Sequence, residues 1–239
     1  WQELKIYPVA KSGHDNCTFH LGNTMSIRLP SGHEYAKQVE KENRWLPYLQ
    51  EHLDYPISKP IAIGKPTGYF PFPWSITLFE CPNINQKQLA KELATALKKL
   101  QMIDCCNGPE AGQHNFFRGG DLKVYEDQTL KALKILENRL PVKQLKNIWD
   151  TCTSKKYTEK NVWVHGDIAP GNILIQNNSF HGIIDFGILG TGDPACDYAM
   201  AWTYFNKEAR KIFLANLPSD MINRAKGWAL WKALITYDD

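Results

Sequence analysis

The first 30 residues alternate apolar and polar positions over short runs. Three such runs are separated by turn-rich stretches: "LKIYPVA", "CTFHLG" and "MSIRLP". This pattern predicts β-strands, because alternate side chains of a strand face opposite sides of a sheet. A helical pattern follows over residues 33–53, where Pro47 predicts a kink. The runs "PIAIG" and "WSITLFE" predict two further strands.

The rest of the chain is mostly helical in pattern. Helices are predicted at about 86–102, 127–140 and 143–153, and helical segments resume at about residue 194. The first of them carries Leu89, Leu93, Leu97 and Leu100 on one face. Between the helices, "VWVHGD", "NILIQ" and "GIIDFG" predict short strands. The last two form a hairpin that turns at Asn177–Asn178.

These elements predict an α+β fold with two lobes. Residues 1–80 form a small antiparallel β lobe with one long helix, and residues 81–239 form a larger, mainly helical lobe. The composition is 43% hydrophobic, which supplies a core and excludes general disorder.

Charge and cysteine content restrict the partners. The net charge of +3 is too small to indicate nucleic-acid or membrane binding without a clustered basic face. No apolar run is long enough for a membrane span or a signal peptide. The six cysteines include no C-x-x-C pair, which argues against a zinc site and favours reduced thiols. We therefore expect a cytoplasmic protein that binds neither nucleic acid nor a membrane; the oligomeric state stays open.

The segment "VHGDIAPGNIL" places polar residues and glycines within an otherwise apolar run, which indicates a functional site. Asn172 opens one strand of the predicted hairpin, and Asp185 follows the other, so the hairpin brings both toward one point, with Asp167 on the preceding loop. Hard cations such as Mg²⁺ prefer such oxygen ligands together with phosphate oxygens. The alternative is a polar turn beside a buried aspartate.

The spacing of these residues resembles the kinase signature H-x-D-x-x-x-x-N followed by D-F-G. Gly166 stands where protein kinases have arginine, and only a short segment separates Asp185 from "GDPACDYA". This form is similar to the aminoglycoside phosphotransferase family of small-molecule kinases. The similarity extends to "EKENRWLPYL", "YFPFPWSITLFE" and "NFFRGGDLKVYED", and so covers most of the chain. Because members of that family commonly continue with more helices after about residue 205, a truncated C-terminus stays open.

The resemblance implies specific roles. Asp167 resembles the catalytic base that accepts the proton of the substrate hydroxyl, while Asn172 and Asp185 resemble the ligands of Mg²⁺. Leu78 and Phe79, within "TLFE", resemble the hinge whose backbone reads the nucleotide base. Asp197 resembles a residue that braces the catalytic loop.

Phosphate positioning in kinases needs a strand cation and a helix glutamate. Arg28 is the basic residue of "NTMSIRLP", and Glu42 shares the apolar face of the 33–53 helix with Leu46. A carboxylate on an apolar face needs a partner, and Arg28 is the obvious one, although kinases usually have lysine there. The alternative is that Arg28 is a surface arginine of the strand.

Two further segments stay open. "KSGHDNCTF" resembles a loop that covers phosphates, with Ser12 and Asn16 near them, but a small polar hairpin turn explains it equally well. The resemblance also implies an ATP-binding cleft between the lobes, and Arg118 is a candidate for holding a loop over that cleft. His165 is expected to pack behind the catalytic loop rather than to catalyse.

We therefore expect a phosphotransferase that uses Mg²⁺ and ATP, with GTP as an open alternative, to phosphorylate a hydroxyl of a small molecule. The resemblance makes an aminoglycoside antibiotic the first candidate acceptor, and the absence of lysine and arginine from residues 161–205, which would repel a polycation, agrees with it. Macrolides, amino alcohols such as choline, and sugars are alternatives. A non-catalytic nucleotide-binding regulator and a metal-dependent phosphoesterase are further ones.

Overall fold

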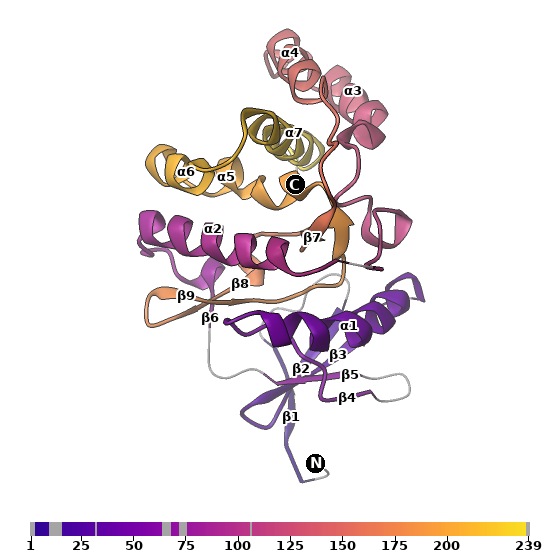
Figure 1. Cartoon of the computed structure of the whole chain (residues 1–239), viewed down its shortest axis with the longest axis vertical. Helices are drawn as coiled ribbons and strands as arrows, with labels where there is room; N and C mark the ends of the chain where they lie inside the picture. The colour runs from indigo at the N-terminus through magenta and orange to yellow at the C-terminus, as the bar shows by residue number, and fades with distance from the viewer. Residues whose placement is uncertain are drawn as a thin grey trace. The chain divides into compact units, whose positions relative to one another are not determined.

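The computed structural model describes residues 3–9, 16–31, 33–63, 68–71, 76–105 and 107–237 (Figure 1). The fold is a mixture of strands and helices, as predicted. Two compact units are present. The first comprises Trp1–Ile84 and Pro170–Ile188, and the second Asn85–Ala169 and Leu189–Asp239.

The first unit contains an antiparallel sheet with the strand order β1-β2-β3-β5-β4. Its strands are β1 (Ile6–Pro8), β2 (Asn16–Leu21), β3 (Met25–Pro30), β4 (Ala62–Ile63) and β5 (Gly68–Pro71). The first three and β4 lie in predicted runs, whereas β5 had not been predicted. In the register of the sheet, Arg28 lies opposite Thr18 of β2 and Gly68 of β5.

One long helix, α1 (His33–His52), belongs to the same unit, lies beside β3 (Figure 1) and includes Pro47. Leu46 and Leu49 are completely buried, and Glu42 on the same face is 3% exposed. The predicted apolar face is therefore confirmed, with a carboxylate within it.

The predicted hairpin is formed by β8 (Ile173–Gln176) and β9 (Ser179–Ile183). Asn177 and Asn178 at its turn both have positive φ, at 52° and 59°, as a type I′ turn requires. β8 also pairs with β6 (Ile76–Thr77), which is followed by the 3₁₀ turn η1 (Leu78–Glu80). This pairing groups residues 170–188 with the first unit, whereas the sequence boundary at residue 80 had assigned them to the helical lobe.

The second unit is built around α2 (Gln86–Met102), which begins at the capping side chain of Asn85. The four predicted leucines of this helix are buried. The helix packs against α6 (Lys207–Leu214) and β7 (Val162–Val164). β7 pairs with β10 (Gly190–Gly192).

Further helices complete the second unit. They are η2 (Gln113–Asn115), η3 (Leu122–Tyr125), α3 (Glu126–Ile135), α4 (Val142–Cys152), η5 (Pro194–Tyr198), α5 (Met200–Thr203) and α7 (Ser219–Ile235). α7 packs against η5 and α4. Gly227 permits this approach, because a Cβ atom there would lie 2.4 Å from Leu122 Cδ2 and 2.8 Å from Cys152 Cβ. Among the described residues, no helix is both long and apolar enough to cross a membrane.

Candidate functional site

The loop that follows β7 carries Asp167. The buried carboxylate of Asp197, in η5, accepts hydrogen bonds from the backbone N–H groups of His165 (2.8 Å) and Gly166 (2.7 Å). Gly166 has a φ of 91°, a backbone conformation that favours glycine. Asp197 therefore holds the loop, which confirms the brace expected from the sequence. His165 is fully buried, and its Nδ1 accepts from the Asp167 N–H (3.2 Å), as expected for a packing residue.

The carboxylate of Asp197 is completely buried. Burial raises the pKa of its carboxyl above the usual range, and the neighbouring His165 and the two backbone hydrogen bonds only partly oppose this effect. A buried carboxylate that accepts two N–H groups is a strong local anchor.

Arg118 holds the loop from a second side. Its Nε donates to the carbonyl oxygen of Gly166 (3.0 Å), and its guanidinium lies 4.9 Å from the ring centre of Trp231 and 5.1 Å from that of Trp228. Tyr125 stacks on Trp231, at 4.1 Å between ring centres. Arg118 is thus fixed to the aromatic side chains of α7, a contact that the sequence had left unspecified.

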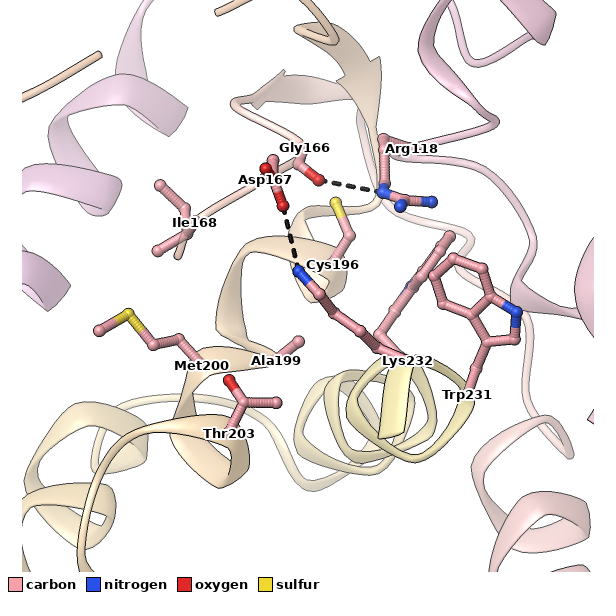
Figure 2. A pocket seen from close by; sticks show the side chains of 11 residues that line it. Arg118, Gly166, Asp167, Ile168, Cys196, Ala199, Met200, Thr203, Trp231 and Lys232 are labelled. Atoms are coloured by element: carbon pink, nitrogen blue, oxygen red, sulfur yellow. Dashed lines mark hydrogen bonds and ion pairs between the residues drawn. The ribbon is translucent and has the colours of Figure 1, made fainter. Parts of the chain in front are cut away.

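A pocket opens beside Asp167, with about 350 Å³ of space when its solvent-open part is included. We call it the Asp167 pocket. Besides Gly166, its walls carry the charged side chains of Asp167, Arg118 and Lys232 and the less polar Ile168, Cys196, Ala199, Met200, Thr203, Trp228 and Trp231. Figure 2 shows Lys232 pointing from α7 toward Asp167, with Nζ 3.3 Å from Oδ1. The pocket thus combines one carboxylate with two cations.

Asn172 and Asp185 lie at the open end of the hairpin in the first unit. Asn172 ends the 3₁₀ turn η4 (Pro170–Asn172), and its carbonyl oxygen accepts from the N–H of Ile184 (2.9 Å). The hairpin therefore brings the two segments together as predicted. Asp185 has a φ of 65°, a conformation that few residues other than glycine adopt and that is concentrated at functional sites.

Arg28 connects β3, α1 and this hairpin. Its Nη1 lies 3.2 Å from Glu42 Oε1, and its Nη2 lies 2.5 Å from Asp185 Oδ1. The predicted ion pair with Glu42 is present, while the second carboxylate had not been foreseen. Burial alone would lower the pKa of Arg28, but the two carboxylates outweigh it and raise that pKa. Burial raises the pKa of Glu42, and Arg28 partly opposes this shift.

The oxygen atoms that Asn172 and Asp185 offer as ligands suit a hard cation such as Mg²⁺. Asn172 and Asp185 supply a side-chain amide oxygen and carboxylate oxygens, and a Mg²⁺ site that uses phosphate oxygens needs only one or two protein ligands of this kind. The Asp185 side chain is 40% exposed and so accessible to a nucleotide-bound ion. Among the described residues, no cluster of three His, Cys, Asp or Glu side chains offers a metal site of another type.

The remaining nucleotide candidates lie in two segments of the first unit. Leu78 is buried and Phe79 is 69% exposed, within the 3₁₀ turn that Glu80 closes by accepting from the Thr77 N–H (2.9 Å). Asn16 begins β2 and is buried. Ser12 lies outside the described residues. The functions of these four residues stay predictions.

Comparison with known proteins identifies the family. A family model described as the phosphotransferase enzyme family matches residues 7–228. The chain belongs to this family. An aminoglycoside 3'-phosphotransferase from Enterococcus faecalis is 25% identical over 103 residues, which cover 43% of this chain and 39% of that protein. The chain thus matches less than half the length of this relative.

Solved structures of this phosphotransferase family share the fold. The streptomycin–ATP ternary complex of APH(2")-IIa is 21% identical, with a TM-score of 0.67, and the match covers 99% of this chain and 86% of that one. For the GDP and kanamycin complex of APH(2")-IIIa, the identity is 18% and the TM-score 0.73, with coverage of 97% and 84%. A macrolide 2'-phosphotransferase type I is 17% identical with a TM-score of 0.70, and the coverage is 98% and 86%.

Proposed function

We propose that the protein is a small-molecule kinase that transfers the γ-phosphoryl group of a nucleoside triphosphate to a hydroxyl. One observation carries the proposal. The carboxylate of Asp167 is 39% exposed at an open pocket, on a loop that a buried carboxylate and an arginine hold from two sides. Phosphoryl transfer depends mainly on positioning and electrostatics, which this rigid arrangement serves.

Asp167 acts as the base in this proposal. An acceptor hydroxyl in the Asp167 pocket donates a hydrogen bond to the carboxylate, which orients it and takes its proton as the new O–P bond forms. The bond between the γ-phosphorus and the bridging oxygen breaks at the same time, and the nucleoside diphosphate leaves. Because Asp197 and Arg118 both hold Gly166, the carboxylate keeps one position while acceptors enter and leave.

The first unit supplies the nucleotide site in this proposal. Asn172 and Asp185 would hold Mg²⁺, which would supply positive charge to neutralise the phosphate oxygens. Arg28, oriented by Glu42, contacts the phosphates, and its fork of donors suits them. The backbone at Leu78 and Phe79 reads the base, and Asn16 and Ser12 are the candidates for contacts with the phosphates. ATP is the first candidate donor, and GTP is the alternative because related structures are GDP complexes.

Aminoglycosides are the first candidate acceptors, since several related structures are aminoglycoside complexes. The electrostatic argument from residues 161–205 is incomplete, however, because the Asp167 pocket also receives Arg118 and Lys232 from outside that range. Two cations favour a second candidate, an acceptor with few ammonium groups such as a macrolide. A macrolide kinase is among the related structures.

A coupled assay of acceptor-dependent ADP formation tests the proposal. The panel contains kanamycin, erythromycin, choline and glucose, each with MgATP or MgGTP. Turnover that depends on one of these acceptors supports a kinase, which we place in the cytoplasm where its nucleotide is available. Nucleotide binding without turnover on a broad acceptor panel would favour the non-catalytic regulator instead.

A further inference from the structure

The side chain of Lys232 reaches the carboxylate proposed as the base. Its Nζ lies 3.3 Å from Asp167 Oδ1, and the two side chains are 45% and 39% exposed (Figure 2). The ammonium group therefore lies beside the proposed base, and it is accessible from the pocket.

The backbone of Lys232 is held firmly. Its neighbour Trp231 donates from Nε1 to Gln128 Oε1 (2.8 Å), and the same indole lies under the guanidinium of Arg118. Earlier in α7, Arg224 forms a buried, bidentate ion pair with Asp193, at 2.6 and 3.2 Å. These contacts anchor α7, and the anchored helix directs the side chain of Lys232 toward the pocket.

Two of the three charged side chains that line the pocket are cations. Among its lining residues, Asp167 is the one carboxylate, while Arg118 and Lys232 are cations. An acceptor with several ammonium groups must bring like charges close to both of them, and one of its ammonium groups competes with Lys232 for Asp167. An acceptor that carries a hydroxyl and few ammonium groups avoids this repulsion.

The other walls suit such an acceptor. Ile168, Met200 and Trp231 present apolar and aromatic surface, and Thr203 adds a hydroxyl. Small molecules commonly bind through apolar contact of this kind, with a few polar groups for orientation.

We propose that Lys232 is a specificity-determining residue that disfavours polycationic acceptors and selects hydroxylated acceptors with few ammonium groups. The inference rests on the proposed kinase function and names the acceptor class of the same pocket. An ion pair this exposed adds little to folding stability, so Lys232 can be replaced without loss of the fold.

The test compares Lys232→Gln with wild type on kanamycin, a polycation, and on erythromycin, which carries a single amino sugar. Lys226→Gln is the matched control, because it removes the same charge from the same helix, α7. The charge of Lys226 affects the pKa of Cys152 rather than the carboxylate of Asp167. We expect Lys232→Gln to lower KM for kanamycin about five- to tenfold and to change that for erythromycin less than about twofold. Lys232→Arg should behave as wild type.

Direct binding separates this inference from the kinase proposal. Trp228 and Trp231 line the pocket, so their fluorescence reports kanamycin binding without turnover. Tighter binding to Lys232→Gln at low salt, with the difference lost at high salt, supports the inference even if no acceptor is phosphorylated. Unchanged kanamycin affinity in Lys232→Gln, or an equal loss of kcat for both acceptors, would overturn it. Absence of turnover in wild type with every acceptor would instead refute the kinase function alone.

Discussion

The ion pair between Arg28 and Glu42 allows a quantitative prediction. The atoms Nη1 and Oε1 lie 3.2 Å apart, and the two side chains are 11% and 3% exposed. A hydrogen bond to a charged group contributes about 1.5–3 kcal/mol, and removal of one partner from a buried pair can cost about 3–5 kcal/mol. Because Arg28 keeps its contact with Asp185, we expect the lower range, about 1.5–3 kcal/mol, for Glu42→Gln.

If Glu42 orients Arg28 toward the phosphates, this range corresponds to a loss of roughly 10- to 150-fold in kcat/KM for ATP. The assay is a double-mutant cycle with Arg28→Gln, Glu42→Gln and the double variant, at a saturating acceptor. Because each single variant already breaks the pair, the two losses should be strongly non-additive, with a coupling of at least about 1 kcal/mol.

An exposed ion pair serves as the control for this cycle. Lys146 and Asp150 lie 2.5 Å apart on α4 but are 40% and 51% exposed, so Asp150→Asn should alter stability by less than about 0.5 kcal/mol and leave ATP use unchanged. If the Arg28 and Glu42 effects on kcat/KM add to within about 0.3 kcal/mol, the positioning argument is wrong.

Three further outcomes follow from the same structure. Asp167→Asn should reduce turnover by roughly 10²–10⁴-fold with little change in nucleotide affinity; a variant that keeps more than about a tenth of wild-type turnover would exclude Asp167 as the base. Asp185→Ala should abolish Mg²⁺-dependent nucleotide binding in calorimetry, and an unchanged affinity would contradict its assignment as a metal ligand. Burial raises the pKa of Asp197, so the folded state binds this proton more tightly than the unfolded state. The stability that this tighter proton binding gives to the folded state is therefore complete below about pH 3.9. It is lost as the pH rises through the raised pKa of Asp197. The unfolding free energy of wild type, measured in urea, should accordingly fall relative to that of Asp197→Asn as the pH rises above about 4; a constant difference would refute this.

The local parts of the site were predictable from the sequence. Asn172 and Asp185 are brought together by a hairpin whose turn residues and strand pattern are visible in the chain. Glu42 falls on an apolar helix face with Leu46, and this placement alone indicated a partner. Such features follow from short-range periodicity, which the sequence displays directly.

Contacts between distant segments were not predictable in this way. Asp185 reaches Arg28 across 157 positions, and Lys232 reaches Asp167 across 65. The absence of basic residues from 161–205 suggested a pocket without cations, yet α7 and the loop before η3 bring in Lys232 and Arg118. A count along the chain cannot detect charges that only tertiary packing brings together.

Two elements differ from what the sequence pattern predicts. β10 has the sequence Gly-Thr-Gly, which lacks a strand pattern, but a Cβ at Gly192 would lie 2.1 Å from Gly119 O, so glycine is needed there. α3 ends at Ile135 rather than near residue 140. Pro141 disfavours helical geometry in Leu140, the residue before it, but this local effect does not explain an end at Ile135.

The central claim is phosphoryl transfer to a hydroxyl oriented by Asp167. The most direct measurement is ³¹P NMR of a reaction containing MgATP and the acceptor panel, with wild type and with Asp167→Asn. The account predicts a new phosphomonoester signal that depends on the acceptor and on wild-type enzyme, with none above background for Asp167→Asn. An equal yield of phosphomonoester from the variant, or ADP and inorganic phosphate alone from wild type with every acceptor, would contradict it.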